Sequence, residues 1–382
     1  MNINKTAGNA VCLLAAMLLP AVAAASCTTT SGPTPITPMP ITASTGPAII
    51  SGAPAIFPIS TVLPLTALPT GSLLITPPTA NPTSTGNGKY LYAQVFNVIA
   101  PTDSSTCQPA NFSSIAAALK QIPAIAQANA CPARYLIKLN PGVYTEQVTM
   151  RPCVDIEGAG EANTTIASAG GVDYASATVT GAALSELRQL TVQNYGCGAS
   201  GSANYNLAIY NSGAASNLTH VTVNAVGGSQ TYGVFNNAAS PTLTNVSVYA
   251  SGMSPSTCQN SSSADTAVAG VVNQSGSAPS LNNAAILATG GVWNTALAND
   301  DASPQISAST LLAPTGTALA NSNGSTAGIQ NSILHGKTAI DNEATVNITA
   351  SEIDGPLTGA GGVISCQNAY NGYYANLNAS CQ

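Results

Sequence analysis

Charged residues are scarce in this chain. They make up 6% of its 382 residues, with 8 Lys and Arg against 14 Asp and Glu and a formal net charge of -6. Binding to phosphate backbones needs clustered Lys and Arg, and the sequence has no such cluster, so nucleic acid is excluded as a partner. Disordered chains combine low hydrophobicity with high charge, whereas 45% of this chain is hydrophobic. We therefore expect a folded domain that Ser, Thr, Asn and Gly keep soluble.

Long apolar runs are also missing beyond the first segment. Pro, Gly, Ser or Thr interrupts every later candidate before it reaches the roughly 18 to 20 apolar residues of a transmembrane helix. The first segment places Lys5 before an apolar run at 11–22 and small residues at 23–26, which is the order of a secretory signal. We predict a signal peptide at 1–26 and an extracytoplasmic location, either secreted or anchored at the outer membrane or cell surface.

Cys27 stands directly after the small residues of this signal. The junction Ala24-Ala25-Ser26-Cys27 resembles the lipobox at which bacterial lipoproteins are cut and lipidated, although Ala24 stands where Leu is usual. Two outcomes stay open: lipidation of Cys27, which is the only membrane contact that we predict, or ordinary cleavage after Ala25.

The next segment lacks charge altogether. Residues 28–88 contain no Asp, Glu, Lys or Arg and hold twelve of the 25 prolines. Such a composition predicts an extended, semi-rigid spacer, so we assign 27–88 as a Pro-rich linker or stalk. Its apolar stretch at 48–75 is a candidate to dock on the folded domain, which we place at 89–382.

The folded part contains an internal repeat. An asparagine recurs at intervals of 25, 37, 26, 22 and 21 residues, each time after small or aliphatic residues. A branched aliphatic residue follows six to eight positions later and opens a short alternating run, which predicts two or three short strands per unit. The asparagines are Asn211, Asn236, Asn273, Asn299, Asn321 and Asn342; the aliphatic residues are Leu218, Leu243, Leu281, Ile306, Ile329 and Ile348.

Units of this length predict a stacked solenoid. One unit cannot bury its apolar side alone, but copies stacked about 4.8 Å apart form a continuous core. The period also suits leucine-rich repeats, yet their LxxLxLxxN order and helical stretches are missing, and a left-handed hexapeptide helix would need a six-residue repeat. We predict that the repeated Asn occupies one corner of each coil, adopts a left-handed backbone conformation there, and hydrogen-bonds the Asn above and below as a structural ladder.

The front of the domain resembles a known family. Four stretches carry the resemblance: NFSSIAAALKQIP (111–123), YLIKLNPGVYTEQVTM (135–150), CVDIEGAGEANTTI (153–166) and SATVTGAALSELRQLTVQN (176–194). They are similar to pectinesterase-like members of the pectin lyase-like superfamily, and 89–382 as a whole resembles uncharacterised bacterial right-handed β-helix repeat proteins. The resemblance implies an all-β fold, a right-handed parallel β-helix with a short N-terminal capping helix.

The catalytic part of that resemblance is incomplete. It implies two aspartates, an arginine and glutamines in the coils after LTVQN, but this stretch offers Gln230, Thr231 and Tyr232 without an acid. Thr and Tyr are not carboxylates at neutral pH and cannot replace them. We therefore predict a binding or display module for a polysaccharide or a cell-surface partner, with tyrosines that stack on sugar rings. The tyrosines in question are Tyr195, Tyr205, Tyr210 and Tyr232.

The alternative is a carbohydrate-active enzyme: pectinesterase-like, a polysaccharide lyase or a glycoside hydrolase. Asp155 and Glu157 are its candidate catalytic pair, because they face the same side of one strand, where we expect them to be solvated. The histidines, His220 and His335, occupy what we take to be equivalent places about four coils apart, too distant to share a metal. Asp300 begins an acidic pair too small for a calcium site. We predict neither a metal nor another cofactor.

The cysteines predict disulfides in an oxidising compartment. We expect Cys366–Cys381 and Cys107–Cys131 to clamp the two ends of the solenoid, and Cys197 and Cys258, in two inserted loops, to form a third bridge. Cys153 is predicted to stay buried and reduced within a strand.

Overall fold

The computed structural model describes residues 92–100, 112–124, 130–196, 205–252 and 266–382. The predictions for the signal peptide, for Cys27 and for the linker lie outside these ranges. Among the described residues, no helix is long and apolar enough to cross a membrane.

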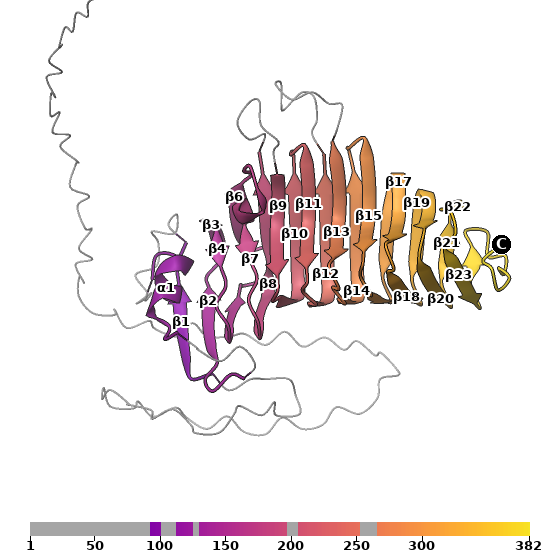
Figure 1. The fold of residues 1–382 in the computed structure, drawn as a ribbon. Helices are drawn as coiled ribbons and strands as arrows, with labels where there is room; N and C mark the ends of the chain where they lie inside the picture. Colours follow the sequence, from indigo (N-terminus) through magenta and orange to yellow (C-terminus); the bar gives the residue numbers. More distant parts are fainter. Residues whose placement is uncertain (1–91, 101–111, 125–129, 197–204, 253–265) are drawn as a thin grey trace, which may run out of the picture. The chain divides into compact units, whose positions relative to one another are not determined.

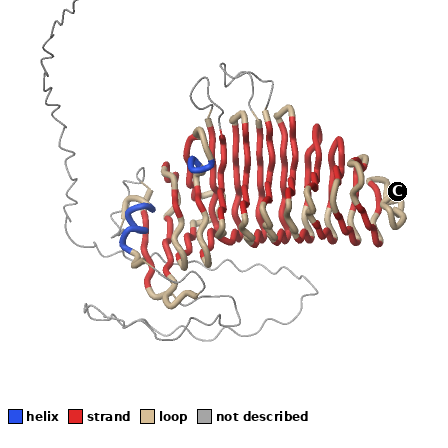
Figure 2. The backbone as a smooth tube through the Cα atoms, in the orientation of Figure 1, coloured by secondary structure: helices blue, strands red, loops and turns tan. Residues whose placement is uncertain are grey.

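The described chain folds into stacked coils whose neighbouring strands pair in parallel (Figures 1 and 2). Each coil contributes strands to three columns, and a longer strand turns the corner between two of them. The first column consists of β1 (Gln94–Val98), β2 (Tyr135–Leu139), β5 (Val154–Glu157), the first parts of β8 (Ser185–Tyr195), β10 (Ser216–Val226), β12 (Thr242–Ser251) and β14 (Ser280–Thr289), then β16 (Gln305–Ser307), β18 (Thr326–Gln330), β20 (Thr345–Thr349) and β23 (Val363–Gln367).

The other two columns complete each coil. The second consists of β3 (Gly142–Thr145), β6 (Thr164–Ala169), the last parts of β8, β10, β12 and β14, the first parts of β17 (Thr310–Ser322) and β19 (Ile333–Asn342), β21 (Glu352–Asp354) and β24 (Tyr370–Asn371). The third consists of β4 (Val148–Thr149), β7 (Val179–Thr180), β9 (Tyr205–Ser212), β11 (Gln230–Asn237), β13 (Ala267–Gln274), β15 (Trp293–Asp300), the last parts of β17 and β19, and β22 (Leu357–Thr358).

The core is built from one apolar residue per coil in each inward row. In the first column, the aliphatic positions predicted from the repeat stand opposite one another in strict register, and the row continues to both ends. Every member is buried, and full burial of such a side chain contributes roughly 1.5 to 3 kcal/mol. The row runs Phe96, Ile137, Ile156, Leu187, Leu218, Leu243, Leu281, Ile306, Ile329, Ile348, Cys366.

The six repeated asparagines form a hydrogen-bonded ladder inside the third column. From Asn211 to Asn342, each side-chain Nδ2 donates to the Oδ1 of the next Asn at 2.8 to 3.3 Å. The ladder begins where it does because Gly181 stands opposite Asn211, and a Cβ at Gly181 would lie 1.9 Å from Asn211 Oδ1.

One part of the ladder prediction is wrong. None of the six asparagines has a positive φ. After the first five, a left-handed residue stands two positions later, at Gly213, Ala238, Ser275, Asp301 and Asn323. An inward-pointing ladder residue belongs to a strand and needs an extended backbone, so the chain turns only after the strand has ended.

The N-terminal end of the stack is closed by helix α1 (Ile115–Gln121). Two charged side chains from the next coil hold it. The Glu146 carboxylate accepts from the backbone N–H groups of Ile115 and Ala116 at 2.9 and 3.0 Å, and Arg151 Nη1 donates to Leu119 O at 2.7 Å. These are the favourable signs of charge at the two ends of a helix dipole. Glu146, in the PGVYTE stretch of the family resemblance, therefore fixes the cap.

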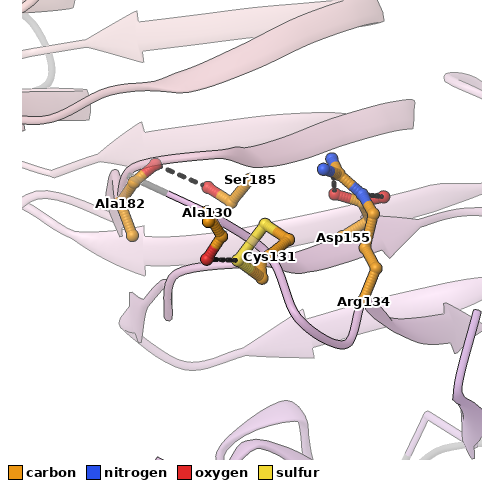
Figure 3. Close-up of a disulfide and its surroundings, with 7 residues drawn as sticks. Ala130, Cys131, Arg134, Asp155, Ala182 and Ser185 are labelled. Carbon is orange, nitrogen blue, oxygen red and sulfur yellow. Dashed lines mark hydrogen bonds and ion pairs between the residues drawn. A yellow bond between two sulfur atoms is a disulfide. The ribbon is translucent and has the colours of Figure 1, made fainter. Parts of the chain in front are cut away.

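The disulfides differ partly from the prediction. Cys366–Cys381 is present at the C-terminal end, with a Cα separation of 5.3 Å. Cys131, however, pairs with Cys153 at 5.5 Å (Figure 3), so Cys153 is not reduced and Cys107–Cys131 is wrong. The reason is local: Cys153 lies in a turn just before β5, with φ of 62°, rather than within a strand. The partner of Cys107 and the proposed third bridge lie outside the described residues.

Candidate functional site

Asp155, one of the two candidate acids, is fully buried. Its Oδ1 and Oδ2 accept from Arg134 Nη2 and Nε at 2.7 and 2.8 Å, and Tyr92 donates its hydroxyl to Oδ2 at 2.8 Å (Figure 3 shows the arginine pair). Arg188 Nη1 lies 3.5 Å from the same oxygen. The expectation of a solvated side chain is wrong, because residues preceding β1 and β2 cover the outer face of β5 at this position.

Glu157 is held by cations on both sides. Arg188 lies 2.7 Å from its carboxylate and Lys138 lies 3.4 Å from it, and Arg188 also bonds Glu186 at 3.1 Å. Burial alone would raise the pKa of Glu157, but the hydrogen bond and charge of Arg188, with help from Lys138, lower it below its usual value. Glu157 is therefore ionised at neutral pH.

This charged cluster is poorly arranged for glycoside hydrolysis. The reaction needs one carboxyl group that keeps its proton near neutral pH as general acid. Glu157 has a lowered pKa, and Asp155 is inaccessible and bonded bidentately by Arg134. What the contacts do achieve is mechanical: they tie three successive coils, β2, β5 and β8, to Tyr92 ahead of β1.

The positions to which the esterase resemblance points lie on β11, in the third column. Thr231 faces inward, is buried and donates to Gly228 O at 3.2 Å. Gln230 and Tyr232 face outward, and Tyr232 donates its hydroxyl to Gln230 Oε1 at 3.0 Å. In the sequence analysis, these three residues stand where the esterase resemblance would require acids. In the structure, Gln230 and Tyr232 lie beside a group of aromatic rings.

These rings form an aromatic patch, which we define as Tyr174, Tyr205, Tyr210, Tyr232 and Phe235. Tyr174, from the short 3-10 helix η1 (Tyr174–Ser176), lies at the centre. Its ring centroid is 5.1 Å from that of Tyr205, 5.5 Å from that of Tyr210 and 4.7 Å from that of Phe235. Tyr232 contacts Phe235 at 5.4 Å, edge to face. The family resemblance gave no signal for Tyr174, which joins the patch only through folding.

Two tyrosines of the patch, Tyr174 and Tyr232, keep their protons over a wide pH range. Burial, followed by the neighbouring tyrosines, raises the pKa of Tyr232 to about 12 and also raises that of Tyr174. The four patch tyrosines are partly exposed, so the patch is open to solvent. Tyr195 does not join them; it lies at the end of the second column with 46% of its surface exposed.

Trp293 extends the same outer face. It stands in register with Ala267, Gln230 and Tyr205, in the row of the third column that begins β9, β11, β13 and β15. With 69% of its surface exposed, it is one of the most exposed large apolar side chains among the described residues. Three coils separate Tyr205 from Trp293, which corresponds to about 14 Å.

The histidines do not occupy equivalent places, contrary to the prediction. His220 lies at the corner between the first and second columns and contacts the Asn245 side chain at 3.2 Å. His335 lies within the second column, and its Nδ1 is 2.5 Å from Asp354 Oδ2. The side chains of His335 and Asp354 are both well exposed. Asp300 contacts Asn323. Within the described ranges, no three His, Cys, Asp or Glu side chains gather as metal ligands do.

Comparisons with known proteins identify the fold. No family model matches the chain. No curated protein matches it. Among solved structures, pectate lyase Pel9A is similar with a TM-score of 0.50 and 13% identity, over 74% of this chain and 76% of that one. Pectin methylesterase from carrot is similar with a TM-score of 0.48 and 16% identity, over 71% of this chain and 88% of that one. Pectin methylesterase PemA from Erwinia chrysanthemi is similar with a TM-score of 0.44 and 13% identity, over 76% of this chain and 92% of that one. The fold predicted from the sequence is confirmed: a right-handed parallel β-helix.

Proposed function

We propose that this chain is an exported polysaccharide-binding module without catalytic activity. The observation that carries the proposal is the aromatic patch, extended by Trp293, on the outer face of the third column. Sugar rings present apolar C–H faces that pack on aromatic side chains and hydroxyls that bond amides and phenols, so aromatic surface beside a few polar groups suits them. Two disulfides support an oxidising, extracytoplasmic setting. Lipidation of Cys27 as an anchor stays a prediction.

The ligand that fits this surface is a neutral polysaccharide. Between Tyr205 and Trp293 the outer row holds Gln230 and Ala267. The next outer row runs from Tyr232 through Ala269 to Thr295. None of these side chains is Asp, Glu, Lys or Arg, and the raised pKa values of Tyr174 and Tyr232 keep these two tyrosines neutral at physiological pH. An acidic chain such as polygalacturonate would need Lys or Arg side chains to neutralise its carboxylates, and these outer rows contain neither.

Affinity electrophoresis against neutral and acidic polysaccharides tests this. Trp293→Ala should weaken binding about tenfold or more, because loss of a central aromatic contact typically exceeds about 1.4 kcal/mol. Tyr249→Ala is the matched control: Tyr249 is 42% exposed but lies on the outer face of the second column. Equal losses in the two variants, or stronger binding to polygalacturonate than to any neutral chain, would refute the assignment.

The alternative, a carbohydrate-active enzyme, rests on a different observation: three carboxylates, Asp155, Glu157 and Glu186, gather with Arg188 on the first column. A screen on methylated and unmethylated polygalacturonate addresses it. General acid–base help alone is worth roughly 10² to 10⁴ in rate, so a true site would lose its activity in Glu157→Gln. Turnover that disappears in that variant while Trp293→Ala retains it would establish the enzyme and overturn the binding module.

A further inference from the structure

The C-terminal tail, residues 366–382, closes the last coil as a disulfide-bonded loop. Cys366–Cys381 joins its two ends. Inside the loop, Leu377 N donates to Ala369 O at 2.8 Å, Ala369 is fully buried and Leu377 packs against the core. Figure 1 shows the tail beyond β21 and β23, at the end of the stack. Small and aliphatic side chains thus cover the core at this end.

Two tyrosines of this loop lie in solvent instead of covering the core. Tyr373 is 90% exposed and Tyr374 is 81% exposed, the highest values among the large apolar side chains of the described residues. The ring of Tyr374 stacks on that of Tyr370, with centroids 5.9 Å apart and an angle of 20° between the ring planes. We call these three residues the tyrosine tip. Exposed apolar side chains that lie together mark interaction sites, whereas single ones are ordinary.

The backbone holds the tyrosine tip in a defined conformation. Asn371 Oδ1 accepts from the N–H groups of Tyr373 and Ala375 at 2.9 and 3.0 Å, and Asn371 O accepts from Tyr374 N at 2.8 Å. Tyr374 has a φ of 60°, a left-handed conformation that bulky residues rarely adopt and that persists where the surrounding contacts impose it. A preformed aromatic surface loses little conformational entropy when it binds. The tip is therefore preorganised for a ligand.

The charges around the tip limit the chemistry of that ligand. The C-terminal tail itself contains no Asp, Glu, Lys or Arg. Glu352 stands opposite Tyr370 in the pairing of β21 with β24, and a Cβ at Gly372 would lie 2.9 Å from the carboxylate of Asp354, which pairs with His335. An anionic ligand is disfavoured beside these carboxylates. Tyrosine rings and asparagine amides suit the C–H faces and hydroxyl groups of a neutral sugar.

The size of the tip favours a small ligand over a protein. A specific protein–protein interface buries roughly 800 Å² on each partner and involves about 20 to 30 residues a side. The whole tail has 17 residues, and Cys366, Ala369 and Cys381 among them are buried. A second copy of this chain would need far more surface than the tip offers, whereas a sugar ring is similar in size to one tyrosine ring.

We propose that the tyrosine tip is a second carbohydrate-binding site, which takes a short stretch of a neutral glycan. The inference extends the proposed function and uses none of the residues of the aromatic patch. A sugar ring packs on the exposed rings of Tyr373 and Tyr374, and Tyr370 holds Tyr374 in place by stacking. The tip belongs to the second column and the patch to the third, so one polysaccharide can be held at two places, which raises avidity beyond either affinity.

Affinity electrophoresis of the full chain in neutral polysaccharides tests the tip separately from the patch. Tyr373→Ala/Tyr374→Ala should weaken binding about tenfold, both in the unmodified chain and in Trp293→Ala. Tyr373→Phe/Tyr374→Phe keeps the rings and should retain most of the binding. Tyr195→Ala/Tyr249→Ala is the matched control, because it removes two exposed tyrosines that belong to neither site, and it should bind as the unmodified chain does.

The outcomes separate the tip from the patch. Tyr373→Ala alone leaves the Tyr370–Tyr374 stack intact and should give a smaller loss in the same direction. Unchanged binding in both tip variants would overturn the tip, whatever Trp293→Ala does. If Trp293→Ala binds normally while the tip variants do not, the patch assignment fails and the tip stands. Loss of binding to polygalacturonate alone, or a dimer in sedimentation that Tyr373→Ala/Tyr374→Ala turns into a monomer, would show that an acidic chain or a second copy occupies the tip and would overturn the proposal.

Discussion

The first coils of the described β-helix and the coils that follow them are held together by different means. In β2, β5 and β8, ion pairs on the outer face join neighbouring strands. From β9 to β19, asparagine amides inside the third column do the same without charge. Both devices repeat at the strand spacing, but the first requires a cover that keeps water away, which Tyr92 and Arg134 provide. The ladder asparagines are buried inside the coils and need no such cover. The stack can therefore be held together with few charged residues.

The largest effect should come from breaking the covered ion pair. In Arg134→Met, Asp155 stays buried without its bidentate partner, and removing one partner of a buried pair typically costs about 3 to 5 kcal/mol. Lys138→Met removes a half-exposed cation from the same cluster and should cost less than about 1 kcal/mol. Urea unfolding at pH 7 measures both.

The double variant Arg134→Met/Asp155→Leu sharpens this comparison. Replacing both partners of a buried pair by apolar residues is often neutral or stabilising, so most of the lost free energy of unfolding should return. Failure to recover would mean that the destabilisation comes from packing around Arg134 rather than from an unpaired carboxylate.

Breaking the ladder should have the next largest effect. Asn273→Ala leaves Asn236 Nδ2 without an acceptor and Asn299 Oδ1 without a donor, and each unsatisfied buried group costs about 1 to 3 kcal/mol. We expect a loss of about 2 to 4 kcal/mol, against less than about 0.5 kcal/mol for the outward Thr244→Ala. A loss no larger than that of the control would show that the ladder amides do not stabilise the stack.

These two devices differed in how far the sequence could predict them. The ladder and the aliphatic row recur along the chain, so a repeated Asn followed six to eight positions later by Leu or Ile identified both Asn273 and Leu281. The buried state of Asp155 and the Cys131–Cys153 bridge have no period; each depends on a segment that folds over one coil only. Tyr174 reaches the aromatic patch from a single-turn helix for the same reason. Features that repeat along the chain can thus be predicted from the sequence, whereas contacts that occur in one coil only become visible in the folded structure.

Acid should separate the two regions with the smallest effect of the series. The pKa of Glu157 is lowered in the folded state, so its stabilising contribution is present above the unfolded value of about 4.5 and is lost as pH falls through the folded value. Asn273 and its ladder neighbours do not titrate. Because solenoid stability is largely a sum over neighbouring coils, lowering the pH from 6 to 3 should speed amide exchange in β5 and β8 severalfold while β13 and β15 change little, once intrinsic exchange rates are corrected. Glu157→Gln provides the control, since its β5 and β8 should exchange at similar corrected rates at both pH values. If instead all four strands respond together in the unmodified chain, the charged cluster is not a separate stabilising unit, and the contrast between the two regions fails.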